Sequence, residues 1–199
     1  VITVDTIAKK FGKELVEYAR VKEAIKIEKQ LITKERKIKK LETDGIINET
    51  NINLNGEQNN AVSTVENSDK NYFLIKGITG SGKTEVYIRL IKNALIEGNG
   101  SIFLVPEISL TPQMMSRLKK EFSNNVALLH SRLTNKERKE EWYSIKSGDK
   151  KVVIGARSAI FAPVQNLKYI ILDEEHETTY KQENNPRYHT KNVAIKRAN

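Results

Sequence analysis

A glycine-rich segment carries the residue types and spacing of a phosphate-binding loop. It fits the pattern G-x-x-x-x-G-K-[ST] at every fixed position, reading Gly77-Ile78-Thr79-Gly80-Ser81-Gly82-Lys83-Thr84. Glycines let backbone N–H groups wrap a phosphate chain, Lys83 reaches the β- and γ-phosphates, and the Thr84 hydroxyl ligates Mg²⁺. The segment predicts a site for ATP or ADP with Mg²⁺. The alternative is a chance glycine-rich turn.

A second polar cluster, Asp173-Glu174-Glu175-His176, follows an apolar run. A phosphate loop works with an acidic residue at the end of another strand, which holds Mg²⁺, and with a group that orients the attacking water. We assign Asp173 to the metal and Glu174 to the general base, and His176 joins the catalytic set because it lies three residues after Asp173. A hydrolase needs this second carboxylate, whereas a kinase of small metabolites does not. The alternative is a solvated acidic turn.

Alternating strands and helices must position these two segments. Short apolar runs predict strands at residues 72–76, 101–105, 126–129, 152–154 and 169–172. Amphipathic stretches predict helices at residues 84–97, after Thr111 with Pro112 at the first helical position, and after Thr134, which forms a capping box with Glu137. This alternation predicts an α/β fold, with a parallel sheet and helices on both of its faces.

The N-terminal region has a different pattern. Residues 1–43 have helical periodicity, residues 33–40 form a basic stretch, and Asp44-Gly45 ends it before a short apolar segment that could form a hairpin. This order predicts a winged-helix-like DNA-binding module at residues 1–54, followed by the nucleotide-binding domain at residues 55–199. The alternative for the basic stretch is a solvated helix that packs on the next domain.

The composition excludes several classes of protein. The 199 residues contain no cysteine, so there is no disulfide framework, thiolate zinc site or cysteine nucleophile. No apolar run is long enough for a membrane span and no signal peptide is apparent, so we expect a cytoplasmic protein. Residues 71–199 hold 21 Lys and Arg against 13 Asp and Glu. This excess favours a nucleic-acid partner, although such charge can also serve solubility alone.

The Asp-Glu-x-His sequence behind the phosphate loop resembles the DExH helicases of superfamily 2. Further segments, in order and with similar spacing across residues 54–199, resemble the PriA family of primosomal replication-restart helicases. They are Gly80-Ser81-Gly82-Lys83-Thr84-Glu85-Val86-Tyr87, Leu104-Val105-Pro106-Glu107-Ile108-Ser109-Leu110-Thr111-Pro112-Gln113, Leu129-His130-Ser131, Gly155-Ala156-Arg157-Ser158-Ala159-Ile160-Phe161-Ala162-Pro163 and Tyr180-Lys181-Gln182.

The resemblance implies the first RecA-like lobe of an ATP-dependent 3′-to-5′ DNA helicase. It implies that Gln58 reads the adenine. It implies that the protein is a monomer, and that its partners are single-stranded and forked DNA and other primosome or single-strand-binding proteins. It also implies an aromatic-rich loop at residues 180–189 that couples DNA to ATP hydrolysis. The implied DNA-binding residues are Pro106, Glu107, Ser109, Arg157, Ser158, Tyr180, Lys181, Arg187 and Tyr188.

The chain also departs from the family pattern. Thr190-Lys191-Asn192 stands where the family has Ala-Arg-Asp. The family's second lobe, arginine finger and cysteine zinc sites are not found in these residues, so we expect a fragment that binds ATP and DNA but does not unwind DNA alone. Two alternatives stay open: a P-loop kinase or transferase, and a nonenzymatic DNA-binding module that depends on nucleotide.

Overall fold

The computed structural model describes residues 53–198 of the chain. The predicted winged-helix-like module at residues 1–54 lies almost wholly outside these residues, so it and the domain boundary stay predictions. Among residues 53–198, no helix combines the length and the apolar composition that a membrane crossing requires.

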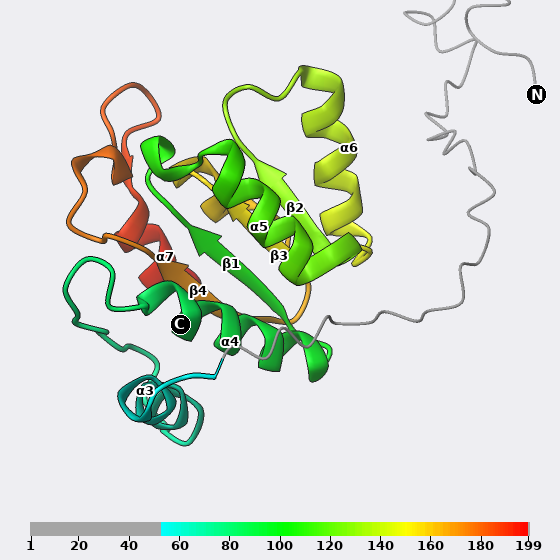
Figure 1. Cartoon of the computed structure of the whole chain (residues 1–199). Helices are drawn as coiled ribbons and strands as arrows, with labels where there is room; N and C mark the ends of the chain where they lie inside the picture. Colours follow the sequence, from blue (N-terminus) through cyan, green and yellow to red (C-terminus); the bar gives the residue numbers. More distant parts are fainter. Residues whose placement is uncertain (1–52, 199) are drawn as a thin grey trace, which may run out of the picture. The chain divides into compact units, whose positions relative to one another are not determined.

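A four-stranded parallel sheet forms the centre of the fold (Figure 1). Its strands are β1 (Gly100–Leu104), β2 (Val126–Leu129), β3 (Val152–Gly155) and β4 (Leu167–Leu172). The order across the sheet is β2-β3-β1-β4, so β1 and β3 are the inner strands. All three pairings are parallel, which confirms the predicted sheet. Because the strands are parallel, their carboxyl ends lie at one edge, where ligands bind in open α/β sheets.

All three helices predicted in this region are present, and the structure adds another helix ahead of the phosphate loop. α3 (Gly56–Glu66) is capped by Asn55, and α4 (Lys83–Ile96) begins directly after the phosphate loop. In α5 (Pro112–Phe122), the Thr111 side chain accepts a hydrogen bond from the Met114 N–H, with Pro112 in the first turn. α6 (Asn135–Lys146) has the predicted capping box between Thr134 and Glu137.

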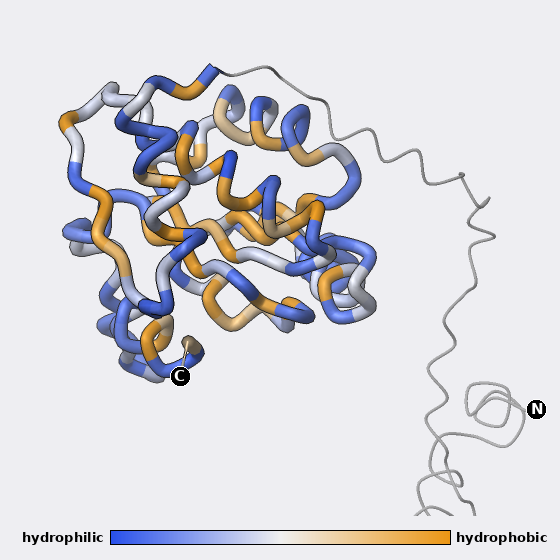
Figure 2. Tube along the Cα trace, turned by 90° about the horizontal axis from the view of Figure 1, so that it is seen from below, coloured by the Kyte–Doolittle hydropathy of each residue, from blue (hydrophilic) through white to orange (hydrophobic). Residues whose placement is uncertain are grey.

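Two apolar clusters cover the two faces of the sheet. One joins α4 and α5 to residues such as Phe103 and Ile154, and the other joins α6, a 3₁₀ turn at Arg157–Phe161 and α7 (Thr190–Ala198) to residues such as Ile102 and Val153. Neighbouring strand residues therefore point to opposite faces, as the period of a strand requires. Apolar stretches gather inside the fold and hydrophilic ones on its outer turns (Figure 2). Helices on both faces confirm the predicted architecture.

The predicted strand at residues 72–76 is wrong. This segment has no strand pairing, and the side chains of Tyr72 and Leu74 are 51% and 67% exposed. An apolar run indicates burial, but a strand also needs a neighbour that completes its backbone hydrogen bonds. Within residues 53–198, β4 pairs only with β1, and its other edge has no strand beside it.

A small hairpin follows β4. A 3₁₀ turn at Thr178–Tyr180 leads into β5 (Lys181–Gln182), which pairs antiparallel with β6 (Tyr188–His189). The sequence predicted a loop at residues 180–189, whereas the structure holds the two ends of that loop together. The hairpin therefore starts from a fixed base close to the end of β4.

Candidate nucleotide-binding site

The phosphate loop leads directly into α4. Gly80 and Gly82 have φ values of 80° and 82°, in the left-handed region that favours glycine. The Ser81 N–H donates a hydrogen bond to the Ile78 carbonyl at 3.1 Å. A Cβ atom on Gly82 would lie only 2.3 Å from Nε2 of Gln58, so the Gln58 side chain would have to move to make room for it. The segment thus forms a tight loop at the N-terminus of a 14-residue helix, which is a favourable place for phosphate.

The ammonium group of Lys83 lies over this loop. Its Nζ donates hydrogen bonds to the carbonyl oxygens of Gly77 at 2.8 Å and Ile78 at 3.2 Å. Because an ammonium has three donors, Lys83 can exchange or extend these contacts toward a phosphate.

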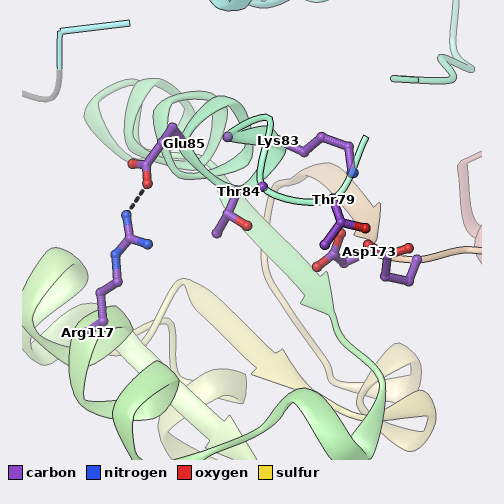
Figure 3. A pocket seen from close by; sticks show the side chains of 9 residues that line it. Thr79, Lys83, Thr84, Glu85, Arg117 and Asp173 are labelled. Atoms are coloured by element: carbon purple, nitrogen blue, oxygen red, sulfur yellow. Dashed lines mark hydrogen bonds and ion pairs between the residues drawn. The ribbon is translucent and has the colours of Figure 1, made fainter. Parts of the chain in front are cut away.

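A hollow of about 290 Å³ opens beside the loop. Figure 3 shows side chains from the loop, from α4 and α5, and from the end of β4 around this space. The lining residues are Thr79, Gly80, Gly82, Lys83, Thr84, Glu85, Arg117, Asp173 and Glu174. The structure therefore brings the two polar clusters of the sequence into one site, although about 90 residues separate them.

Asp173 lies directly after β4, and its backbone N–H donates to the Leu104 carbonyl at 2.9 Å. Burial is the main cause that raises the pKa of its carboxyl group, and the nearby Glu174 raises it further. A hydrogen bond from the Glu174 backbone and the charge of Lys83 oppose this shift. A cation bound here would relieve the same unfavourable charge, so the environment suits a metal ligand.

Glu174 adopts a left-handed conformation with a φ of 46°, and the turn is closed by the Glu177 N–H, which donates to the Glu174 carbonyl at 2.9 Å. The His176 side chain is 74% exposed, and its Nδ1 lies 3.8 Å from Oε2 of Glu174. Glu174 lines the hollow, whereas His176 is not among its lining residues.

The protein groups fit Mg²⁺ bound together with a nucleotide. Among residues 53–198, no group of three or more His, Asp or Glu side chains is arranged to hold a metal alone. Mg²⁺ commonly takes only one or two protein ligands and completes its shell with water and phosphate oxygens. Thr84 and Asp173 can supply such a pair.

Gln58 contacts the phosphate loop itself. Its side-chain oxygen accepts from the Asn55 N–H at 2.9 Å, and its Nε2 donates to the Ser81 carbonyl at 3.2 Å. These bonds place the Gln58 side chain against the loop at the first turn of α3. Its expected contact with adenine is not tested by these bonds.

The loops expected to bind DNA follow the carboxyl ends of β1 and β3. After β1, Pro106 is buried while Glu107 is exposed and Ser109 is partly exposed. After β3, Ser158 is exposed, but Arg157 is occupied: its Nη1 donates to the carbonyls of Thr179 at 3.2 Å and Lys181 at 3.0 Å. Arg157 therefore ties its loop to the base of the hairpin.

Tyr180, which the resemblance places among the DNA-binding residues, is only 1% exposed, so its ring offers no free face to a base in this structure. The hairpin has other groups at its surface. Lys181 and Arg187 are exposed, and Tyr188 is half-buried with its ring edge-on to Phe161, 5.0 Å between centroids. The composition of residues 180–189 does not indicate which of the two tyrosines is buried in the core.

The sequence did not predict one ion pair that lies at the site. Arg117 on α5 pairs with Glu85 on α4, and both line the hollow (Figure 3). Arg117 carries no local signal of this role, because it reaches the site only when α4 and α5 pack on the same face of the sheet.

Comparisons with known proteins agree with the geometry. Residues 55–197 match the family described as DEAD/DEAH box helicase. The chain is 54% identical over 135 residues to the Replication restart protein PriA of Bacillus subtilis (strain 168), covering 68% of this chain and 17% of that protein. Proteins of the same name from Treponema pallidum (strain Nichols) and Haemophilus influenzae are 45% identical over 145 residues and 44% identical over 158 residues.

These last two matches cover 72% and 78% of this chain and 22% of each relative. The chain thus spans about a fifth of the length of these three relatives. The similarity confirms the resemblance to PriA proteins, and the parallel sheet confirms the predicted lobe. With its family match over more than half of its residues, the chain belongs to the DEAD/DEAH box helicase family.

Proposed function

We propose that this chain is the ATP-binding first lobe of a 3′-to-5′ DNA helicase that acts in replication restart. The observation that carries the proposal is the convergence of the phosphate loop and the Asp173-Glu174 turn on one hollow. The similarity to PriA proteins supports the same conclusion. A P-loop kinase or transferase is disfavoured, because the second carboxylate suits a reaction with water.

In this proposal the loop residues bind the nucleotide phosphates through their N–H groups, with the Lys83 ammonium as a charged donor. Thr84 and Asp173 hold Mg²⁺, which neutralises charge on the phosphate oxygens when bound. Glu174 accepts a proton from the water that attacks the γ-phosphate. His176 stays close to Glu174, where it can orient that carboxylate.

DNA binds, in this proposal, along the edge where the parallel strands end. Glu107, Ser109 and Ser158 face solvent there or are partly exposed, and the hairpin adds Lys181, Arg187 and Tyr188. The 21 Lys and Arg against 13 Asp and Glu in residues 71–199 favour a polyanion. Arg157 would contribute through the loop that it anchors.

We further propose that the partners are single-stranded and forked DNA and other primosome or single-strand-binding proteins, in the cytoplasm, and that the protein is a monomer. The resemblance also implies zinc in full-length family members. With no cysteine among 199 residues, this chain supplies no thiolate ligand for it.

The test is ATP hydrolysis with and without single-stranded DNA, by residues 1–199 and by a full-length protein that contains them. We expect DNA to stimulate the full-length protein, and Glu174→Gln to abolish its turnover while nucleotide still binds. For residues 1–199 alone we expect nucleotide binding with negligible hydrolysis, because an arginine supplied from elsewhere can contribute roughly 10³–10⁵ in rate. A full-length protein that binds nucleotide and DNA without hydrolysis would instead favour the nonenzymatic module.

A further inference from the structure

The buried hydroxyl of Tyr180 joins the ends of two strands. It lies 3.0 Å from the carbonyl oxygen of Leu104, the last residue of β1, and 2.7 Å from that of Asp173, directly after β4. Its one proton is shared between these two acceptors.

The carbonyl of Asp173 belongs to the peptide that links the two carboxylate residues of the site. Glu174, on the other side of that peptide, has a φ of 46°, which is unfavourable for a residue with a Cβ atom. Rotation of this peptide would redirect the Glu174 side chain and displace Asp173. A hydrogen bond to its carbonyl opposes that rotation.

Tyr180 is itself held on both sides. The buried Thr190 hydroxyl donates to the Tyr180 carbonyl at 2.9 Å. The Arg157 guanidinium donates to the carbonyls of the two neighbouring residues, Thr179 and Lys181. The tyrosine therefore has a fixed backbone from which its hydroxyl can act on the turn.

We propose that Tyr180 is a positioning residue for the magnesium-binding turn: its hydroxyl fixes the peptide between Asp173 and Glu174. The inference rests on the proposed nucleotide site and adds a residue that does not line the hollow. Because Tyr180 acts on the turn and not on the phosphate loop, its loss affects only the part of nucleotide binding that depends on Mg²⁺.

The test compares ADP binding to residues 1–199 in Mg²⁺ and in EDTA. Tyr180→Phe keeps the buried ring and removes the hydroxyl. We expect this variant to lose at least threefold of the enhancement that Mg²⁺ gives, with affinity in EDTA within twofold of wild type. Tyr143→Phe, on the exposed side of α6, is the matched control and should change neither value.

Three results overturn the inference. Unchanged Mg²⁺ enhancement in Tyr180→Phe leaves the proposed nucleotide site standing and removes the role of Tyr180. An equal loss of affinity in Mg²⁺ and in EDTA shows a general structural effect. A wild-type chain that binds no nucleotide overturns the proposed function and this inference with it.

A second variant serves if circular dichroism shows that Tyr180→Phe does not fold. Thr190→Val removes the hydroxyl that holds the Tyr180 backbone and keeps a side chain of similar size. We expect it to lose about half of the Mg²⁺ enhancement with unchanged affinity in EDTA. An enhancement equal to that of wild type overturns the inference.

Discussion

Lys83 combines a charge with two contacts to the loop that it serves. Its ammonium donates to the carbonyls of Gly77 and Ile78, so it is already placed over the expected phosphate position. Lys83→Ala removes a charged hydrogen bond to phosphate, worth about 1.5–3 kcal/mol, and should weaken ADP binding by roughly 10-fold to 150-fold. Isothermal titration calorimetry in Mg²⁺ measures this change.

Lys76→Ala is the matched control for Lys83, because Lys76 is an exposed lysine just before the loop. Its ADP affinity should stay within twofold of wild type. If Lys83→Ala binds ADP as tightly as Lys76→Ala, the assignment of the loop to phosphate is incorrect.

The raised pKa of Asp173 gives the site a dependence on pH. Because the folded chain protonates Asp173 at a higher pH than an ordinary aspartate, an ionised Asp173 destabilises the fold, and this cost disappears as the pH falls through the folded pKa. Mg²⁺ needs the ionised form of Asp173, so Mg²⁺-dependent ADP binding should be lost as the pH falls. The midpoint of this loss should lie at a higher pH than the usual pKa of an aspartate. Fluorescence titrations of an ADP analogue at several pH values measure this midpoint.

Glu174→Gln separates the causes of that shift. Burial remains in this variant, but the repulsion from Glu174 is gone, so the pKa of Asp173 falls and the midpoint moves to lower pH. Glu175→Gln is the control, since Glu175 is not among the causes of the shift, and its midpoint should match wild type. A midpoint that does not move in Glu174→Gln contradicts the coupling between the two carboxylates.

At the scale of the elements, α4 and α5 are joined by an ion pair inside the fold. Nζ of Lys92 lies 2.6 Å from Oε2 of Glu121, and both residues are buried. Glu121→Gln replaces a hydrogen bond between two charged groups, so it should lower the free energy of unfolding by about 1.5–3 kcal/mol. Urea denaturation followed by circular dichroism measures the loss.

An exposed ion pair on the same lobe calibrates that measurement. Glu97 pairs with Lys168 at 2.5 Å, with both side chains partly open to solvent. Glu97→Gln should lower the free energy of unfolding much less than Glu121→Gln does, because water screens the exposed pair. Equal losses of unfolding free energy in the two variants would show that burial does not increase the contribution of the Lys92–Glu121 pair to stability.

Local signals predicted most of the elements. The Thr134 capping box marks a helix start through hydrogen bonds within a few residues, and Pro112 marks one because its missing N–H costs nothing in the first turn. The structure has both. The segment at residues 72–76 failed because strand formation depends on a neighbour, which an apolar run does not specify.

The site divides in the same way. The phosphate loop and the Asp173-Glu174 turn are each recognisable from contiguous residues. The burial of Tyr180 is not, because its hydroxyl meets Leu104, 76 residues earlier in the chain. Arg117 likewise enters the site only through the packing of α5 beside α4. Residues that reach the site only through tertiary packing thus cannot be identified from local motifs.

For the whole molecule, the proposed function requires that DNA at one edge of the sheet affects nucleotide at the phosphate loop. The Arg157 guanidinium and the Tyr180 hydroxyl form a continuous set of contacts from the loop after β3, through the base of the hairpin, to the Asp173 carbonyl. The hairpin carries Arg187 and Tyr188 beyond this base. In the proposed function, DNA held by these two residues would act on the turn through this short path.

Changing Arg187 and Tyr188 to alanine together tests this path in the full-length protein. Stacking on a base is worth about 1–3 kcal/mol and each phosphate contact on single strands contributes about 0.7 to the salt slope of binding. We expect weaker, less salt-dependent DNA binding and lower DNA stimulation of ATP hydrolysis, with ADP affinity unchanged. Arg138→Ala with Tyr143→Ala, two exposed residues of α6, removes the same groups elsewhere and should leave stimulation intact. Equal stimulation in both double variants would mean that the hairpin does not couple DNA to the nucleotide site.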